Sequence, residues 1–372
     1  MRKALRIRIV GGSLGGLFAA VLLRAQGHEV RIYERSATGL AGCGAGLVAQ
    51  QGLFAILRAI GCEHVAHVGV VAHERITFAR DGTIAQRQAT PQMQISWDNL
   101  FRTVRGRLPD EDYVTGRSVV SVSPEGSTVA LALDDGTRDS ADLVIGADGV
   151  GSLIREALVG GPASSRYAGY VAWRGLVPED DVPADAAAQL FDRFCFNMMP
   201  DSHVLGYTVT GPNSETQRGQ RRYNWVWYRR TPGEDLGKAL TDANGHAHEF
   251  SLAPGQVSAS RRQALVDDAV VLLPPPFATA VAAEQRPFIQ AIFDYETPRM
   301  ANGRLALPGD AAFVVRPHTA MGVAKAAGDA MALSSALSKL PLEEALKAYE
   351  RERLPAGAEI AAYGRRLAER FV

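Results

Sequence analysis

The stretch ALRIRIVGGSLGGLFAAVLLRAQGHEVRIYE, residues 4–34, decides the fold class of this chain. Residues 4–10 are rich in isoleucine and valine and predict a strand, and residues 17–26 predict a helix that ends at Gly27. Residues 28–34 predict a second strand. A strand, a glycine-rich turn, a helix and a second strand form a βαβ unit, so we expect an α/β protein with a parallel sheet.

The glycine-rich turn VGGSLGGL, residues 10–17, has the chemistry of a dinucleotide-phosphate site. The N-terminus of a helix presents unpaired N–H groups and a positive dipole end, which suit a pyrophosphate. Gly11 allows the tight turn, Gly16 lets the helix approach the strand, and Glu34 suits the ribose hydroxyls. Ser13 replaces the middle glycine of the fingerprint, and its hydroxyl suits a phosphate. A turn without any ligand is the alternative.

Two later segments repeat this plan of a strand followed by a turn. GADGVGSLIR, residues 146–155, places Asp148 after an apolar strand, and LPGDAAFVVRPHTAMG, residues 307–322, places Asp310 in the same way. An ordinary Asp-Gly turn or strand–turn–helix crossover is the alternative for each segment alone. Three such turns in one chain favour a single site for FAD.

The third of these segments suits the flavin end of FAD. Asp310 can accept hydrogen bonds from the hydroxyls of a ribityl chain. We expect a helix to begin near residues 321–323, and its N-terminus suits negative charge on a reduced flavin ring.

The composition is that of an ordinary globular protein. A chain of 372 residues with 47% hydrophobic and 22% charged residues predicts two domains. Forty basic residues balance forty acidic ones, which favours neither a nucleic-acid nor a membrane-surface partner. Cys43, Cys62 and Cys195 are scattered, which predicts no disulfide framework and no metal site and suits the cytoplasm. We expect neither a secretory signal nor a membrane span.

The pattern along the chain predicts a second, β-rich domain. Residues 170–228 combine strand patterns with many aromatic side chains. Further helices are expected at residues 53–60, 99–108, 255–264 and 287–293, and a rigid loop at residues 274–276. We assign residues 1–67, 97–165 and 296–372 to a discontinuous FAD-binding domain, and residues 68–96 and 166–295 to a substrate domain inserted into it.

These motifs resemble those of the single-component FAD-dependent aromatic hydroxylases, the p-hydroxybenzoate hydroxylase-like flavoprotein monooxygenases. The pattern GADGxxSxxR is matched in full by residues 146–155. The third motif departs from the family at Phe313, Ala320 and Ala324, where histidine, glycine and asparagine are usual. YAGYVAWRG at residues 167–175 and the Arg316–His318 run resemble the 2,6-dihydroxypyridine 3-hydroxylase group, whose members act on hydroxylated pyridines.

The resemblance implies a Rossmann-like FAD-binding domain of the glutathione reductase type with an inserted β-rich substrate domain. It implies that Glu34 and Arg35 hold the adenosine ribose, and that Arg102 approaches the pyrophosphate. It places Val119 by the adenine and Asp148 near the diphosphate–ribose region. The full expected cofactor set is Gly11, Ser13, Leu14, Gly16, Glu34, Arg35, Arg102, Val119, Asp148, Gly149, Asp310, Pro317, Met321 and Gly322.

The resemblance also implies a reaction. NAD(P)H docks transiently and reduces FAD, O₂ adds to form a flavin C4a-hydroperoxide, and an electron-rich ring such as 2,6-dihydroxypyridine receives the hydroxyl group. A homodimer is a common outcome for such proteins.

Three residues are candidates for contact with the aromatic substrate. His318 follows Pro317 in the loop expected to line the flavin, and imidazole can titrate near neutral pH. Arg174 and Tyr207 lie on expected strands of the inserted domain. A structural histidine, and side chains that only pack on the sheet, are the alternatives.

Other functions on the same fold stay open at this point. A flavin-dependent reductase would transfer hydride to its substrate without inserting oxygen. A halogenase would need additional motifs, which we do not find. A flavin-binding or ligand-binding protein without turnover is favoured only by the departures at Phe313, Ala320 and Ala324.

Overall fold

The computed structural model describes residues 3–37, 40 and 46–369, and Cys43 lies outside these residues. In this part of the chain, one six-stranded sheet has the order β19-β20-β12-β1-β2-β8. Its strands are β1 (Arg6–Val10), β2 (Glu29–Glu34), β8 (Tyr113–Thr115), β12 (Leu143–Gly146), β19 (Ala301–Asn302) and β20 (Leu305–Ala306). Parallel pairing joins β1 to β2 and to β12, as the βαβ prediction requires.

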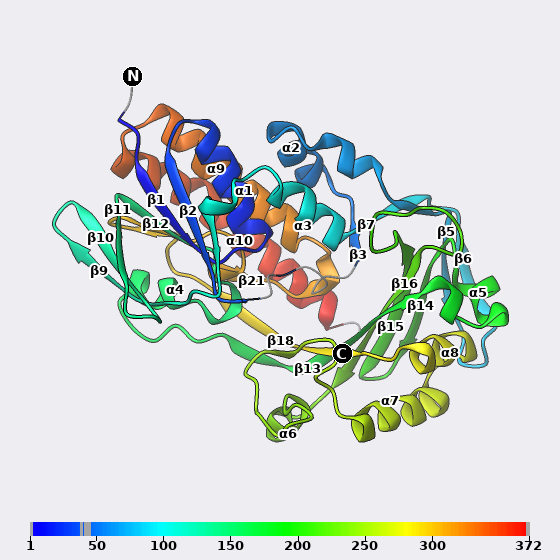
Figure 1. Cartoon of the computed structure of the whole chain (residues 1–372). Helices are drawn as coiled ribbons and strands as arrows, with labels where there is room; N and C mark the ends of the chain where they lie inside the picture. The colour runs from blue at the N-terminus through cyan, green and yellow to red at the C-terminus, as the bar shows by residue number, and fades with distance from the viewer. Residues whose placement is uncertain (1–2, 38–39, 41–45, 370–372) are drawn as a thin grey trace.

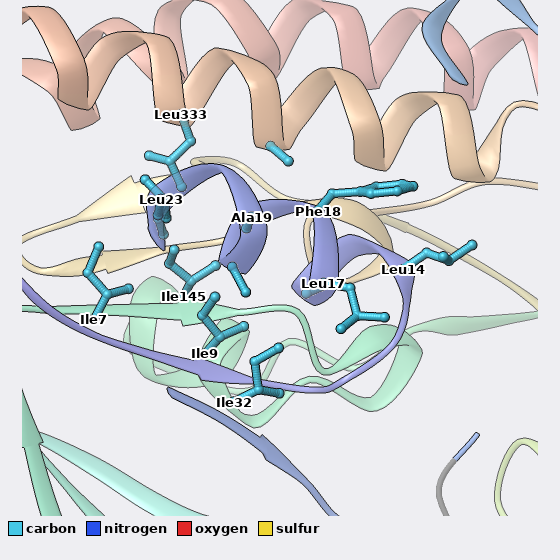
Figure 2. Packing of buried hydrophobic residues seen from close by; sticks show 14 of the residues in the cluster. Ile7, Ile9, Leu14, Leu17, Phe18, Ala19, Leu23, Ile32, Ile145 and Leu333 are labelled. Carbon is cyan, nitrogen blue, oxygen red and sulfur yellow. The ribbon is translucent and has the colours of Figure 1, made fainter. Parts of the chain in front are cut away.

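Helices pack on this sheet and bury its apolar side chains. Helix α1 (Leu14–Ala25) lies between the sheet and α9 (Gly322–Lys339). Leu17 of α1 points toward the strands, and Leu333 of α9 points toward α1 (Figure 2). Ile9 pairs in register with Ile32 and Ile145, and none of these three side chains is exposed. Each such burial contributes roughly 1.5–3 kcal/mol. The other helices of this half are α2 (Gln51–Ala59), α3 (Trp97–Arg105), α4 (Leu153–Val159) and α10 (Leu342–Ala368).

A second, larger sheet forms the other half of the molecule (Figure 1). Among the described residues it is nine-stranded, with the order β17-β18-β13-β16-β15-β14-β5-β6 and with β21 paired to β18. Its strands are β5 (Glu74–Phe78), β6 (Ile84–Gln88), β13 (Arg166–Pro178), β14 (Arg193–Met199), β15 (Ser202–Val209), β16 (Arg222–Arg230), β17 (Ser251–Leu252), β18 (Phe288–Glu296) and β21 (Phe313–Val314).

The two faces of the large sheet have different neighbours. Tyr223, Trp225 and Trp227 alternate along β16 and pack in one core with residues of α7 (Ala259–Leu272) and α8 (Pro275–Ala283). Helices α5 (Ala184–Leu190) and α6 (Gly233–Ala239) lie on the same domain. We call the opposite face, which carries Tyr228 and turns toward the six-stranded sheet, the inner face (Figure 1).

Two small sheets complete the fold. β3 (Gly46–Val48), β7 (Gln92–Ser96) and β4 (Val70–Ala72) form one, and it packs against β15 on the inner face. β9 (Val119–Glu125), β10 (Thr128–Leu133) and β11 (Arg138–Ala141) form the other. The division into two domains stays a proposal, and the pairing of β21 with β18 joins the chain on both sides of residue 296.

Two of the predicted elements are wrong. Residues 287–293 were expected as helix, but Phe288–Glu296 is the strand β18, whose neighbours β13 and β17 supply its hydrogen bonds. Residues 274–276 were expected as a loop, but Pro275 and Pro276 open helix α8. Proline suits the first turn of a helix because the N–H groups there have no partner in the helix.

Candidate functional site

The first glycine-rich turn has no room for larger residues at its key positions. Gly11 has φ +101°, and a Cβ there would lie 2.3 Å from the carbonyl oxygen of Ala147. A Cβ at Gly16 would lie 2.1 Å from the carbonyl oxygen of Gly11. The helix therefore starts as close to β1 as backbone atoms allow, and the roles expected for both glycines agree with this geometry.

The start of α1 keeps its hydrogen-bonding capacity for a ligand. Ser13 is the N-cap residue, but its hydroxyl makes no capping hydrogen bond, and the first turn has no acidic residue. The positive end of the helix dipole is therefore not compensated there, which suits a pyrophosphate. Leu14, in contrast, is buried and packs into the core behind this turn.

Glu34 shapes this turn, a role that its sequence position did not reveal. Its carboxylate accepts hydrogen bonds from the backbone N–H groups of Gly12 and Ser36, both at 2.8 Å. Only 5% of Glu34 is exposed, whereas Arg35 is exposed. A carboxylate has further lone pairs, so a ribose hydroxyl can still donate to it.

The arginine of the second motif connects the second motif to the third. Arg155 is 1% exposed, and its guanidinium donates to the carbonyl oxygens of Gly149 and Asp310, among others. It also lies over the ring of Tyr295, at 3.9 Å from the ring centroid. One side chain thereby holds the Asp148-Gly149 turn and the Gly309-Asp310 turn together, which explains why an arginine belongs to this motif.

Asp148 is more strongly tied to its own motif than expected. Its carboxylate accepts hydrogen bonds from the Ser152 hydroxyl at 2.5 Å and from the Ile154 backbone N–H at 3.2 Å. Burial raises the pKa of this carboxyl. Asp148 therefore positions the start of α4 beside Gly149, which has φ +77°.

Asp310 has the surroundings expected of a cofactor contact. It lies in the short turn η5 (Gly309–Ala311) and is exposed to solvent, yet the protein around it raises the pKa of its carboxyl by desolvation. A carboxyl that is both reachable and desolvated lies in a recess. Behind it, Asp329 accepts from the Gly309 backbone N–H at 2.9 Å and pairs with Arg353.

The loop between η5 and α9 is held from both sides. Arg316 pairs with Asp294 of β18 at 2.7 Å, and the side chain of Gln50 donates to the Ala320 carbonyl at 3.1 Å. Ala320 adopts φ +53°, which explains why glycine is usual there in the family. Pro317 belongs to the single turn η6 (Pro317–Thr319).

Helix α9 then begins at Gly322 after Met321, and it has no side-chain cap and no acidic residue in its first turn. This N-terminus therefore keeps the positive charge expected beside a flavin ring. The departing residue Phe313 is explained by packing, because it is buried against Gly357 of α10.

His318 joins the loop to the inner face. Its Nε2 lies 2.9 Å from the hydroxyl of Tyr170, and its ring centroid lies 4.5 Å from that of Tyr228 and 5.0 Å from that of His203. Burial, and then the charge of Arg316, lower the pKa of His318 to about 4. His318 is therefore neutral at neutral pH, which corrects the expectation that it titrates there.

The other two substrate candidates also lie on the inner face. Tyr207 on β15 is 5% exposed, and burial raises the pKa of its hydroxyl. Its ring packs against β3, because a Cβ at Gly46 would lie 2.2 Å from it. Arg174 on β13 donates to Gln290 at 3.0 Å. Two strands, β13 and β15, and the η6 loop therefore bring the three candidates to one face of the sheet.

Two expected cofactor residues have different surroundings. Arg102 on α3 is exposed and donates to the carbonyl of Pro212, beyond the end of β15. Val119 opens β9 and packs in the core of the six-stranded half. Sequence reasoning missed Gln50 and Tyr170, because their roles depend on contacts between distant segments.

These residues fit FAD. A close-packed glycine turn and the uncapped N-terminus of α1 suit its pyrophosphate, and the recessed Asp310 suits its ribityl chain. The second uncapped N-terminus, that of α9, suits the flavin ring. Within the part that the structure describes, no group of three or more metal-ligating side chains is found, and no helix is long and apolar enough to cross a membrane.

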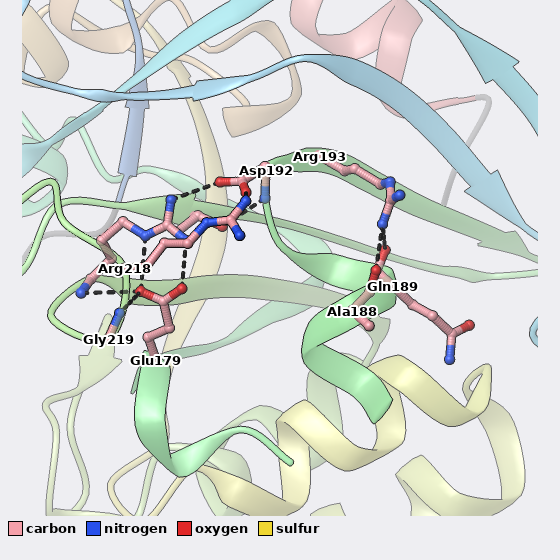
Figure 3. A network of polar contacts seen from close by, with 9 residues as sticks. Glu179, Ala188, Gln189, Asp192, Arg193, Arg218 and Gly219 are labelled. Carbon is pink, nitrogen blue, oxygen red and sulfur yellow. Dashed lines mark hydrogen bonds and ion pairs between the residues drawn. The ribbon is translucent and has the colours of Figure 1, made fainter. Parts of the chain in front are cut away.

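A separate cavity of about 520 Å³ lies at the outer end of the large sheet. It is bordered by what we call the outer network, which consists of Glu74, Glu179, Asp192, Arg193, Arg218 and Arg221. Figure 3 shows Glu179, Asp192, Arg193 and Arg218 of this network. Arg221 pairs with Glu179 and Asp192, and Arg193 pairs with Glu74. The charges of this network are balanced within the protein.

Two family models and several known proteins are similar to this chain. Residues 284–363 match the family described as FAD binding domain, and residues 167–294 match the family described as FAD binding domain-like. The chain is 33% identical to 2,6-dihydroxypyridine 3-monooxygenase of Paenarthrobacter nicotinovorans over 366 residues, which cover 95% of this chain and 88% of that protein.

Two further comparisons extend this similarity. The chain is 32% identical to 3-amino-4-hydroxybenzoate 2-monooxygenase of Streptomyces cremeus over 387 residues, covering 99% of this chain and 88% of that protein. The solved structure of 2,6-dihydroxypyridine-3-hydroxylase from Arthrobacter nicotinovorans has a TM-score of 0.92 and 31% identity, covering 100% of this chain and 93% of that one.

Proposed function

This chain belongs to the FAD-dependent aromatic monooxygenases, and we propose that its substrate is a small hydroxypyridine such as 2,6-dihydroxypyridine. FAD is its cofactor, and members of the family use NAD(P)H. The names of its relatives cover both a dihydroxypyridine and an aminohydroxybenzoate. The proposal of a pyridine rather than a benzoate as substrate therefore depends on the residues of the inner face.

When bound, FAD supplies the redox chemistry: it accepts hydride from NAD(P)H and activates O₂ for the transfer of one oxygen atom. The chain would hold the phosphates at Gly11 and Ser13 and the ribityl hydroxyls at Asp310. Its remaining tasks are to orient the ring, to exclude water and to manage the proton of the ring hydroxyl.

The contact between His318 and Tyr170 carries the proposal for the ring. The two side chains come from the η6 loop and from β13, and the 2.9 Å contact joins Nε2 to a hydroxyl. A neutral imidazole beside a neutral phenol can accept a hydrogen bond from a ring hydroxyl, which polarises the O–H bond and makes the ring more electron-rich. His203 and Tyr228 stack beside this pair and exclude water.

Arg174, also on β13, and Tyr207 on β15 complete the proposed substrate contacts on the inner face. The Tyr207 hydroxyl keeps its proton at neutral pH and so donates to a ring oxygen.

A cytoplasmic location and a homodimer also stay predictions.

The test is oxygen insertion. FAD-loaded protein receives NADH or NADPH under ¹⁸O₂ with 2,6-dihydroxypyridine, and the product is analysed by mass spectrometry. We expect substrate-stimulated NAD(P)H oxidation and one ¹⁸O atom per product molecule. NAD(P)H oxidation with a reduced, unoxygenated product would instead support hydride transfer to the substrate. Hydroxylation of benzoates but not of pyridines would contradict the proposed substrate.

A further inference from the structure

Arg174 lies at the centre of the inner face. The register of β13 pairs Arg174 with Val226 of β16 on one side and with Phe288 of β18 on the other. Tyr170 and Ala172 precede it on the same face and pack beside Tyr228. The long side chain of Arg174 therefore extends over the middle of the sheet, on the side of His318 rather than on the side of α7.

The guanidinium of Arg174 has few partners in the described chain. Its Nη1 donates to the side-chain oxygen of Gln290 at 3.0 Å, and its carbon lies 5.8 Å from the ring centroid of Phe288. Its Nε is enclosed and has no hydrogen-bond partner. An arginine carries five N–H donors, so most of its capacity is left for another group.

Two other partly buried arginines, Arg222 on β16 and Arg316 beside η6, are paired with carboxylates. Arg222 pairs with Asp98 at 3.4 Å, and Arg316 pairs with Asp294 at 2.7 Å. Arg174 has no such ion pair within the residues that the structure describes. Taking a cation out of water is costly unless an opposite charge compensates for it, so a partly buried arginine without a carboxylate favours an anionic ligand.

Two hydroxyl groups surround the same point of the inner face. Arg174 pairs with Val226, and Tyr228 lies two residues further along β16. Tyr207 pairs with Asn224, two residues before Val226, so the two tyrosines flank Arg174 on the inner face. The positive charge of Arg174 opposes the rise in the pKa of both tyrosine hydroxyls. Burial still raises the pKa of Tyr228 to about 12, and both hydroxyls keep their protons. One cation and two neutral donors thus point to the same kind of ligand group, an anionic oxygen.

We propose, on the basis of the function proposed above, that Arg174 selects aromatic substrates that carry an anionic oxygen. The oxygen belongs either to an ionised ring hydroxyl or to a carboxylate on the ring, and it lies on the Arg174 guanidinium beside the hydroxyls of Tyr207 and Tyr228. A neutral ring of the same shape would leave the cation desolvated without compensation, and so would bind more weakly.

The test compares binding to FAD-loaded wild type, Arg174→Gln and Arg174→Lys. The matched control is Arg229→Gln, because Arg229 lies on β16 but faces α7, where it pairs with Asp268 at 2.7 Å. Binding is measured at neutral pH without NAD(P)H, through the change in flavin absorbance. FAD content and thermal unfolding are recorded for each variant, so that misfolding is recognised separately.

Two pairs of ligands separate the sources of the negative charge. 6-Hydroxynicotinate and 6-hydroxynicotinamide differ in a carboxylate, and 2,6-dihydroxypyridine and 2-hydroxy-6-methoxypyridine differ in one acidic hydroxyl. We expect Arg174→Gln to weaken binding of the anion by about 10- to 100-fold in at least one pair, with little change for its neutral counterpart. Arg174→Lys should retain part of the preference, and Arg229→Gln all of it.

The outcomes are distinguishable from those of the monooxygenase test. Equal binding of the anions by wild type and by a flavin-loaded Arg174→Gln variant would overturn the assignment of Arg174, whatever the enzyme hydroxylates. An anion preference that depends on Arg174 would support it, even if none of the four compounds is hydroxylated. In that case the proposal of a hydroxypyridine substrate would be wrong, and the assignment of Arg174 to an anion-binding site would still be supported.

Discussion

The outer network and the inner face are two polar regions of the same sheet, and they differ in how their charges are satisfied. In the outer network, Arg221 makes ion pairs with two carboxylates, and only 6% of its side chain is exposed (Figure 3). On the inner face, Arg174 has no carboxylate partner in the described chain, and both amide atoms of the buried Asn224 lack hydrogen bonds there.

This difference distinguishes polar groups that stabilise the fold from polar groups that are suited to binding a ligand. Buried polar atoms nearly always have partners in native proteins, because an unmade hydrogen bond costs about 1–3 kcal/mol. A network that is complete within the protein serves the fold even when it borders a cavity. A face that lacks partners next to a cofactor site is better suited to binding, so we place the substrate on the inner face.

Removing one carboxylate from the outer network should give the largest effect on stability. Glu179→Ala removes one of the two carboxylates that compensate for the positive charge of the buried Arg221. We therefore expect the free energy of unfolding to fall by about 3–5 kcal/mol. Urea unfolding of the FAD-loaded protein measures this. The kcat/KM of the folded fraction should stay within about twofold of wild type. A large loss of kcat/KM without a loss of stability would give the outer network a functional role.

The second prediction concerns the pH dependence of stability on the inner face. His318 has a pKa of about 4 in the folded chain, below its ordinary value of 6.5, so the unfolded chain binds the proton first as pH falls. The stability from a neutral His318 is therefore complete above pH 6.5 and is lost progressively toward pH 4. The total is about 3 kcal/mol.

His318→Gln tests this dependence, because glutamine can still bond to Tyr170 but does not titrate. Between neutral pH and about pH 4.5, wild type should lose about 2–3 kcal/mol more of its unfolding free energy than the variant. Other titrating groups contribute to both proteins and cancel in the difference. Identical losses in the two proteins would mean that His318 is solvated like an ordinary histidine.

A third, smaller effect compares two tyrosines on opposite faces. Tyr207→Phe removes a hydroxyl from the inner face, and we expect kcat/KM to fall by about tenfold, or about 1.4 kcal/mol. Tyr223→Phe is the control, because Tyr223 packs on the side of α7 and α8. It should leave kcat/KM unchanged. An equal fall in kcat/KM for the two substitutions would contradict the proposal that only the inner face contacts the substrate.

The smallest expected effect on the free energy of unfolding is that of an exposed ion pair. Lys347 and Glu343 pair at 2.7 Å on α10, and both side chains are more than two-thirds exposed. Lys347→Ala should change the free energy of unfolding by less than about 0.5 kcal/mol, because water screens such pairs. A loss comparable to that of Glu179→Ala, measured by the same urea titration, would show that burial does not govern these effects.

The sequence was sufficient to predict the parallel sheet and its glycine turn. Both depend on local patterns: the apolar run before Gly11 and the helix after it are visible in one segment. The strand β18 was mistaken for a helix because its short apolar pattern fits either structure, and only pairing with β13 decides between them. The consecutive prolines at residues 274–276 are typical of a rigid loop, but proline also suits the first turn of a helix, which is where Pro275 and Pro276 lie.

The candidate site was predictable in its residues but not in their roles. Arg155 belongs to a motif, yet its contacts with Asp310 come from a segment more than 150 residues away in sequence. The near-neutral titration expected of His318 fails because the inner face and Arg316 surround it after folding. Which face Arg174 and Tyr207 occupy depends on how β13 and β15 pair with β16, a strand that is separate in sequence from β13.

The most direct test of the account is a crystal structure of the FAD-loaded protein with bound 2,6-dihydroxypyridine. We predict that the ring lies on the inner face, with an oxygen on Arg174 or Tyr207 and another near His318. A ring bound instead in the cavity beside Glu179 and Arg221, with the inner face left without ligand, would contradict the account.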